Sequence, residues 1–400
     1  MVSLFRHAGL LRDKTSAQRG RVTSIELFFD LVFVFAITQL SHGLLHKLTL
    51  AGLVETTLLF FAVWWVWVYT TWSTNWLDPD RMPVRVALFV LMLAGLVMSI
   101  SIPSAFGAGG LAFAGAYVFM QVGRTAFCVC ATGLASESNR RNFQRILSWL
   151  VLSGLFWIAG GLAEGNARLA LWAIAIGLEY LAPWTGFWVP KLDRSTTADW
   201  DVDGHHMAER CSLFVLIALG ESLIITGSTF EKSAVTVTTV AALVSAFVGT
   251  AAMWWVYFAI GAERGTHHIA HAADPGRVAR VGYTYLHIVI VAGVIVAAVA
   301  DELVLAHPGG HVELPALLAI VGAPALFLAG NGWFKWLSAP YFPLSHLVGL
   351  ALLALIGATE FQFHLFTPLA LSLVTTGVLV LAAIWEWLSL TSGEAEAHRA

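Results

Sequence analysis

In this 400-residue sequence, the residues that could take part in chemistry are the ionisable ones inside long apolar segments. At the centre of a bilayer an ionised group costs at least about 2.5–3.5 kcal/mol on insertion scales, so each one needs a partner or a function. Asp30 and Glu26 lie four residues apart, on one face of a helix. The other candidates for an ion or solute path are Arg124, Glu179, Glu209, Glu221, Glu386 and His287.

Two interpretations of these charges follow. In the first, Arg124 pairs with Asp30 or Glu179 and locks helices together. In the second, Asp30, Arg124, Glu179 and Glu221 line a central polar cavity. One arginine does not neutralise every acid, so some carboxyl groups are expected to hold protons and to carry them during transport. The excess of acid favours a cation path over an anion path.

The elements that position these residues are predicted to be membrane-spanning helices. Charged residues make up 12% of the chain, roughly half the quarter that is usual in soluble domains. Several segments without any charge are long enough for the roughly 20 residues that span a bilayer. We therefore predict an all-α, polytopic bundle that contacts a lipid bilayer. Its twelve helices are expected near 24–46, 51–73, 84–102, 110–135, 145–163, 168–188, 207–229, 235–262, 281–304, 313–331, 343–360 and 366–390.

The distribution of Lys and Arg predicts the orientation. Of the 22 such residues, eighteen fall in the termini and alternate loops, and three (Lys47, Arg168 and Lys232) fall in the opposite loops, with Arg124 inside a helix. Because basic residues resist translocation, both termini are expected in the cytoplasm. No removable signal peptide is expected before the first helix.

Fragments recur in the same order in the two halves and predict a duplication. The matches are Glu26 with Glu209, Trp64-Trp65 with Trp254-Trp255, Arg85-Val86 with Arg280-Val281, Gly123-Arg124 with Gly330-Asn331, and Glu179 with Glu386. Two parallel six-helix repeats are the expected result, and sites in such folds lie between the halves. The expected division is a basic tail at 1–23, a first repeat at 24–190, a linker at 191–206, a second repeat at 207–390 and a tail at 391–400.

Several familiar chemistries have no motif in this sequence. We find no phosphate-binding glycine loop followed by Lys and Ser or Thr, no H-E-x-x-H and no G-x-S-x-G. An ATP-driven pump and a familiar membrane protease are therefore disfavoured. No enzyme activity, cofactor, metal site or nucleic-acid partner is expected.

The segment from Thr23 to Val34, T-S-I-E-L-F-F-D-L-V-F-V, resembles the first-helix motif of the bacterial low temperature requirement protein A family. The segment from Ala208 to Ser222, Tyr283-Thr284-Tyr285-Leu286-His287 and the segment from Ala325 to Gly330 also fit, so that the resemblance covers residues 21–390. It implies a multi-pass protein of the bacterial plasma membrane, linked by the family name to growth in the cold.

A second resemblance concerns mechanism. Residues 28–38, F-F-D-L-V-F-V-F-A-I-T, are similar to the F-S-D first helix of potassium channels built from six-helix repeats, and Ile37 would then form the pore constriction. Phe29 and Leu31 depart from that motif. The leading functional hypothesis is a secondary transporter or permease for an ion or small solute. A potassium-like cation channel is the first alternative, and a membrane-embedded enzyme or non-transporting stress factor is the second.

Overall fold

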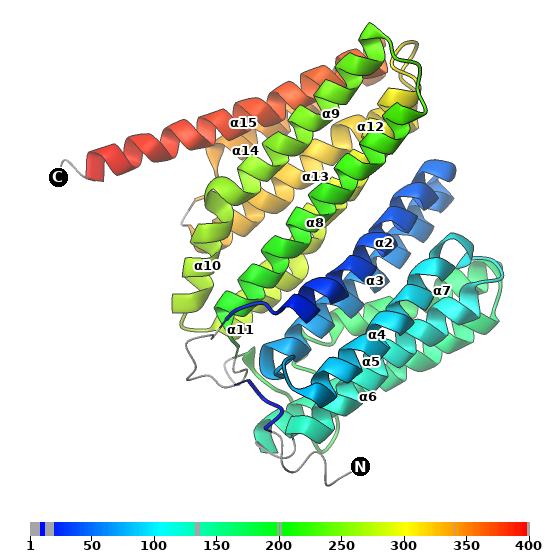
Figure 1. Ribbon diagram of the computed structural model, residues 1–400, viewed down its shortest axis with the longest axis vertical. Coiled ribbons are helices and arrows are strands. Elements are labelled where there is room, and N and C mark those ends of the chain that lie inside the picture. The colour runs from blue at the N-terminus through cyan, green and yellow to red at the C-terminus, as the bar shows by residue number, and fades with distance from the viewer. Residues whose placement is uncertain are drawn as a thin grey trace. The chain divides into compact units, whose positions relative to one another are not determined.

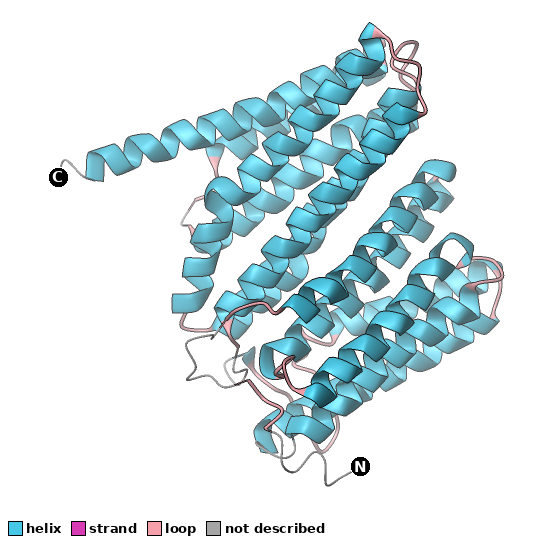
Figure 2. Cartoon of the chain, in the orientation of Figure 1, coloured by secondary structure: helices cyan, strands magenta, loops and turns pink. Residues whose placement is uncertain are grey.

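The computed structural model describes residues 9–12, 20–132, 137–197, 200, 202–339 and 341–397, and over these residues the fold is all-α (Figure 2). Twelve of the described helices have 17 residues or more. Within the described part of the chain, eleven helices are long and apolar enough to cross a membrane. These findings confirm the predicted helical membrane bundle. The predicted tail at 1–23 lies mostly outside the described residues. The tail expected at 391–400 is wrong for residues 391–397, because the last helix continues to Ala397.

Contacts between residues divide the chain into two compact units. Unit 1 comprises Met1–Arg210 with Ile269–Arg280, and unit 2 comprises Cys211–His268 with Val281–Ala400. The division therefore falls within a helix, α8 (Gly204–Glu231), rather than in the linker that was expected at 191–206. The arrangement as two repeats stays a prediction, and each unit is described by itself.

Unit 1 contains six long helices and the start of α8. They are α2 (Ser24–His46), α3 (Leu50–Trp76), α4 (Met82–Ser101), α5 (Gly110–Thr132), α6 (Glu137–Leu162) and α7 (Gly165–Leu181). Neighbours in sequence pack together, as Figure 1 shows for α4, α5 and α6, and α3 also contacts α5 and α7. The indoles of Trp64, Trp65 and Trp67 on α3 are fully buried. Because α3 contacts α2, α5 and α7, its side chains can reach polar side chains of several other helices.

Local sequence explains where two of these helices begin. Thr23 and Glu26 form a capping box at the start of α2, in which the Glu26 carboxylate accepts the backbone N–H of Thr23 at 2.9 Å. At the start of α3, the Thr49 hydroxyl accepts the backbone N–H of Gly52 at 3.1 Å. Glu26 therefore has a structural role in addition to any functional one.

Arg168 of α7 joins two helix ends inside unit 1. Its side chain is 4% exposed, and Nη1 donates to the carbonyl oxygens of Ala105 at 2.7 Å and Gly107 at 2.6 Å. Nε donates to the carbonyls of Gly160 at 3.1 Å and Ala163 at 3.0 Å, at the end of α6. Carbonyls at helix ends lack intrahelical partners and carry partial negative charge, which a guanidinium satisfies. Arg168 was expected in a loop, and the structure buries it instead.

Glycine is required beside this arginine. A Cβ on Gly110 would lie 2.5 Å from the Cζ atom of Arg168. The bare backbone at the start of α5 therefore allows the guanidinium to approach both helix ends.

Unit 2 contains the rest of α8 and five further long helices with π-helical segments. The elements are α9 (Val237–Val256), η3 (Tyr257–Gly261), α10 (Ala262–His271), η4 (Ala279–Leu286), α12 (His287–Ala306), α13 (Leu314–Ser338), α14 (Leu344–Phe363) and α15 (Pro368–Ala397). The division between units falls within α10 and η4, and the short α11 (Pro275–Val278) belongs to unit 1. In unit 2, α13 packs against α12, α14 and α15, and α9 packs against α15.

Several predicted boundaries were wrong. Helix α6 begins at Glu137 rather than near 145, because its first two turns are polar and carry no hydropathy signal. Helix α7 ends at Leu181 rather than at 188, two residues before Pro183. The single helix expected over 235–262 is α9 followed by the π-helix η3 and by α10. Hydropathy does not distinguish the i→i+5 hydrogen bonds of a π-helix from the i→i+4 bonds of an α-helix, so the π-helical segments were not predicted.

Replacing Arg168 with Leu should destabilise unit 1. The variant leaves four buried or partly buried carbonyl oxygens without their cationic donor, so we expect the free energy of unfolding to fall by about 3 kcal/mol. The measurement is unfolding of the purified chain in detergent, followed by tryptophan fluorescence. Arg85→Leu is the matched control, because Arg85 forms only an exposed ion pair with Asp80 and should change stability by under about 1 kcal/mol. Equal midpoints for the two variants would contradict the assigned role.

Candidate functional site

Asp30 of α2 forms a two-point ion pair with Arg210 of α8 in unit 1. Nη1 of Arg210 lies 2.7 Å from Oδ2 of Asp30, and Nη2 lies 2.8 Å from Oδ1. The indole N–H of Trp67 on α3 donates to Oδ1 at 2.8 Å. Asp30 and Arg210 are both fully buried. This bidentate geometry, with a third donor, is what a buried ion pair needs to offset the loss of hydration.

Glu26 lies one turn before Asp30 and has its own partners. Nε2 of His206 is 2.7 Å from Oε1 of Glu26, and Nη2 of Arg12 is 2.9 Å from Oε2. The Asn75 amide nitrogen is 3.2 Å from Nδ1 of His206, and the Asn75 amide oxygen accepts the backbone N–H of Asp203 at 2.8 Å. The amide therefore donates to Nδ1, and Nε2–H donates to Glu26.

We call Glu26, Asp30, Trp67, Asn75, His206 and Arg210, with Arg12, the Asp30 cluster. It ties the start of α2, the end of α3 and the start of α8 together within unit 1. Each acidic group in it has a direct cationic or imidazole partner. The cluster is therefore suited to holding helices in place.

Arg124 does not pair directly with either acid that was expected to bind it. Its Nη1 donates to the Val66 carbonyl and to the Thr70 hydroxyl, each at 3.2 Å, and its Nη2 donates to Oε1 of Gln121. The prediction of an Arg124 ion pair with Asp30 or Glu179 is wrong. Arg210 pairs with Asp30, and Gln121 lies between Arg124 and Glu179.

Glu179 of α7 is held by neutral donors from two other helices. The Ser153 hydroxyl donates to Oε1 at 2.7 Å, and the Trp157 indole N–H donates to the same oxygen at 3.0 Å. The Tyr117 hydroxyl and, at 3.4 Å, the Gln121 amide donate to Oε2. Glu179 is 1% exposed. We call Tyr117, Gln121, Arg124, Ser153, Trp157 and Glu179 the Glu179 cluster.

The chemistry of the Glu179 cluster differs from that of the Asp30 cluster. Among the described residues, no basic side chain lies within ion-pair distance of Glu179. Hydroxyl groups can donate to a carboxylate or turn to accept from a carboxylic acid, whereas an ammonium or guanidinium only donates. Tyr117 and Ser153 therefore allow Glu179 to be held either ionised or protonated. Such a carboxyl group can exchange a proton or bind a cation.

The two clusters contact successive turns of the same helix. Trp67 of α3 reaches Asp30, and Thr70, one turn later, accepts from Arg124. Unit 1 thus brings Asp30, Arg124 and Glu179 onto helices around α3. Glu221, which is 8% exposed, lies in the part of α8 that belongs to unit 2. The cavity of all four residues stays a prediction.

Unit 2 has a lysine-centred cluster. Nζ of Lys335 lies 2.7 Å from both carboxylate oxygens of Glu386 and 3.4 Å from Nε2 of His346, and it donates to the Val256 carbonyl at 2.9 Å. Glu386, expected near the inner end of the last helix, is therefore paired. Lys335 was expected in a loop, and the structure places it in α13 with its side chain 10% exposed.

The remaining predicted residues have the following places. His287 is fully buried at the start of α12, with Nδ1 2.8 Å from the Gly282 carbonyl and Nε2 2.8 Å from the Tyr257 hydroxyl. Glu209 is exposed and accepts the backbone N–H of Val22 at 3.2 Å. Ile37 is buried in α2 at 3% exposure.

The buried acids were predicted from the sequence, but the basic and imidazole side chains that pair with them were not. Arg210 and Lys335 were counted as cytoplasmic loop charges, and His206 was placed in a linker. The signal that was available is spacing: His206 and Arg210 are four residues apart and face the same side of a helix, as Glu26 and Asp30 do. Matching those two i, i+4 pairs would have suggested the cluster.

The Asp30–Arg210 pair should show strong energetic coupling. Asp30→Asn or Arg210→Gln alone leaves a buried charge without its partner, so each should lower the free energy of unfolding by about 3–5 kcal/mol. The double variant should be less damaging than the sum, with a coupling energy of about 2–3 kcal/mol. The exposed Asp80–Arg85 pair supplies the control cycle and should couple by under about 1 kcal/mol. Additive effects at Asp30 and Arg210 would refute the pairing.

Comparison with known proteins identifies the family. The family model for the bacterial low temperature requirement A protein (LtrA) matches residues 21–384. An uncharacterized protein of Rhizobium meliloti (strain 1021) is 40% identical over 384 residues, which cover 96% of this chain and 93% of that protein. No solved structure matches the chain. The likeness to potassium channels gains no support and stays a prediction. The chain is thus a multi-pass membrane protein that belongs to the bacterial low temperature requirement A family.

Proposed function

We propose that this protein is a secondary transporter or permease for an ion or small solute, and that Glu179 takes up and releases a proton or a cation during transport. The observation that carries the proposal is the environment of Glu179. It is a carboxyl group buried among helices that are apolar enough to span a membrane, and neutral groups hold it. Ionisable residues in such positions mark ion paths and proton relays by default.

Asp30 has a different role in this proposal. Its two oxygens are engaged by one guanidinium and an indole, so exchanging a proton there would break a bidentate ion pair. We therefore assign Asp30 and Arg210 to holding α2, α3 and α8 together. Glu179 is the exchangeable carboxyl group.

Gln121 connects the exchangeable group to a fixed positive charge. Its amide nitrogen reaches Glu179 at 3.4 Å, and its amide oxygen accepts from Arg124. Protonating Glu179 removes one of the two opposite charges that this amide bridges. This change in charge alters the strength of the hydrogen bonds from Arg124 to α3. Proton uptake by Glu179 is in this way linked to movement of a helix.

Orientation and duplication are parts of the same proposal. Removing the buried Arg168, Arg210 and Lys335 from the count of loop charges leaves the excess of basic residues on the same side. This supports a plasma-membrane protein with both termini in the cytoplasm. A six-plus-six duplication is supported by the packing within each unit, since α4–α5, α5–α6 and α6–α7 contacts correspond in chain order to α12–α13, α13–α14 and α14–α15 contacts.

Two alternatives make different predictions. A cation channel of the potassium type would pass single-channel currents that change when Ile37 is replaced. A membrane-embedded enzyme or a non-transporting stress factor would leave liposome permeability unchanged. The environment of Glu179 favours transport over both.

The test is ion flux into proteoliposomes that contain the purified full chain. Under an imposed membrane potential, we expect the protein to raise proton, Na⁺ or K⁺ flux above that of protein-free liposomes. Glu179→Gln keeps the shape of the side chain but removes the exchangeable group, so the flux should fall by about tenfold or more.

Glu164→Gln is the matched control, because Glu164 is an exposed acid that precedes the same helix. This variant should conduct like the wild type. Flux of all three ions equal to that of empty liposomes would contradict the proposal, and so would full activity of the Glu179 variant.

A further inference from the structure

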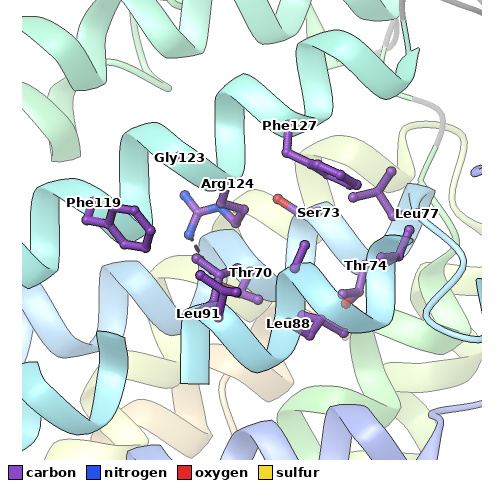
Figure 3. Close-up of a pocket in the computed structure, with 13 residues that line it drawn as sticks. Thr70, Ser73, Thr74, Leu77, Leu88, Leu91, Phe119, Gly123, Arg124 and Phe127 are labelled. Atoms are coloured by element: carbon purple, nitrogen blue, oxygen red, sulfur yellow. Dashed lines mark hydrogen bonds between the residues drawn. The ribbon is translucent and has the colours of Figure 1, made fainter. Parts of the chain in front are cut away.

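A pocket of about 200 Å³ lies in unit 1 among α3, α4 and α5. Figure 3 shows its lining. Leu91 of α4 and the rings of Phe119 and Phe127 of α5 give it apolar walls, and Thr70 and Ser73 of α3 are among its lining residues. The surface of the pocket is therefore almost entirely apolar, and the polar side chains in its lining contribute little of it. Ligand sites are commonly lined in this way, with a small number of polar groups.

Arg124 projects from α5 into the lining of this pocket, toward Thr70 (Figure 3). The guanidinium has five N–H groups, and the structure gives it three hydrogen bonds. Among the described residues its Nε–H has no acceptor, although the side chain is only 4% exposed. A buried donor without an acceptor costs about 1–3 kcal/mol, and more when it is charged. The site is thus incomplete without a further acceptor.

The acceptor that this site lacks is an anion. No carboxylate of the described residues contacts Arg124, and Glu179 is reached only through Gln121. Guanidinium groups bind carboxylates in a planar, two-point geometry. One guanidinium in an apolar pocket matches a ligand with one negative charge.

The mouth of the pocket indicates how the ligand arrives. Val90 on α4 and Phe119 on α5 line the pocket and are 46% and 51% exposed. Large apolar side chains on the outside of membrane-spanning helices face lipid. A ligand that enters between them must itself be soluble in the bilayer, which excludes small hydrophilic anions.

The position of Arg124 along α5 distinguishes between two kinds of bilayer-soluble anion. Arg124 lies eight residues before Thr132, the last residue of α5, which is about 12 Å along the helix. The phosphate of a two-chain phospholipid is anchored at the interface by its headgroup. A single-chain carboxylic acid can carry its one charge further into the protein and leave its tail against the apolar walls.

We propose that the pocket among α3, α4 and α5 binds the carboxylate of a lipophilic single-chain acid, such as a fatty acid, with Arg124 as its cationic ligand. The acid enters from the bilayer past Phe119, and its carboxylate accepts the guanidinium N–H groups that the protein leaves unused. This site goes beyond the proposed transport function. It requires neither ion flux nor an exchangeable proton on Glu179.

Equilibrium binding of radiolabelled decanoate to the purified full chain in detergent micelles tests the site, with empty micelles subtracted. We expect saturable binding that decanoate displaces and decanol does not, because decanol lacks the charge. Arg124→Gln should weaken binding by about tenfold or more, since it removes a buried ion pair.

Two glycines of α5 supply a matched pair that leaves Arg124 in place. Gly123 lines the pocket and Gly115 does not, and an added Cβ meets nothing within 4 Å at either position. Gly123→Leu should fill the pocket and weaken decanoate binding by about tenfold. Gly115→Leu should leave the affinity unchanged.

Three results would overturn the inference: no saturable binding by the wild type, equal displacement by decanol, or wild-type affinity in Gly123→Leu. If Arg124→Gln fails to fold, the two glycine variants still decide. Because no flux is measured, a failure here is distinct from a failure of the transport proposal.

Discussion

The cost of placing an ionised group among apolar helices is the constraint on which this structure depends. Most of the buried charges meet it with a direct partner. Arg168 is satisfied by backbone carbonyls at helix ends, Asp30 by Arg210, and Lys335 by Glu386. These contacts link helices that are not consecutive in the chain, in addition to the packing between consecutive helices. In this protein, buried charge is therefore first a way of fixing helix packing.

Glu179 and Arg124 meet the same cost in a different way. They lie on α5 and α7 of unit 1, a glutamine amide separates them, and each is satisfied mostly by neutral groups. A direct ion pair between them would have made both inert. Keeping them apart leaves the Nε–H of Arg124 without an acceptor among the described residues, and in the proposed transport function it leaves the Glu179 carboxyl group free to exchange. The Asp30 cluster contacts α3 through Trp67, one turn before Thr70, and in the proposal it holds the helices in place while the charge on Glu179 changes.

Much of the fold could be predicted from the sequence, because a helix that spans a bilayer must present a long apolar run. The first helix was predicted at 24–46, and the structure has Ser24–His46. Burial of Asp30, Arg124 and Glu179 followed from the same runs. Their partners could not be predicted in this way, because His206, Arg210 and Lys335 stand beyond or at the edge of apolar segments and look like loop charges. Arg210 lay inside the helix predicted at 207–229 but was counted as a loop charge, and the structure shows that α8 and α13 extend far enough to carry His206 and Lys335 as well.

The central claim is that Glu179 is exchangeable whereas Asp30 is fixed in an ion pair. Dicyclohexylcarbodiimide, a lipophilic reagent, modifies protonated carboxyl groups in apolar surroundings, and mass spectrometry of the treated protein identifies the modified residue. The account predicts modification at Glu179, increasing as the pH is lowered, with Asp30 left intact. Modification of Asp30 in preference to Glu179, or an unmodified Glu179 at every pH at which the protein stays folded, would contradict it.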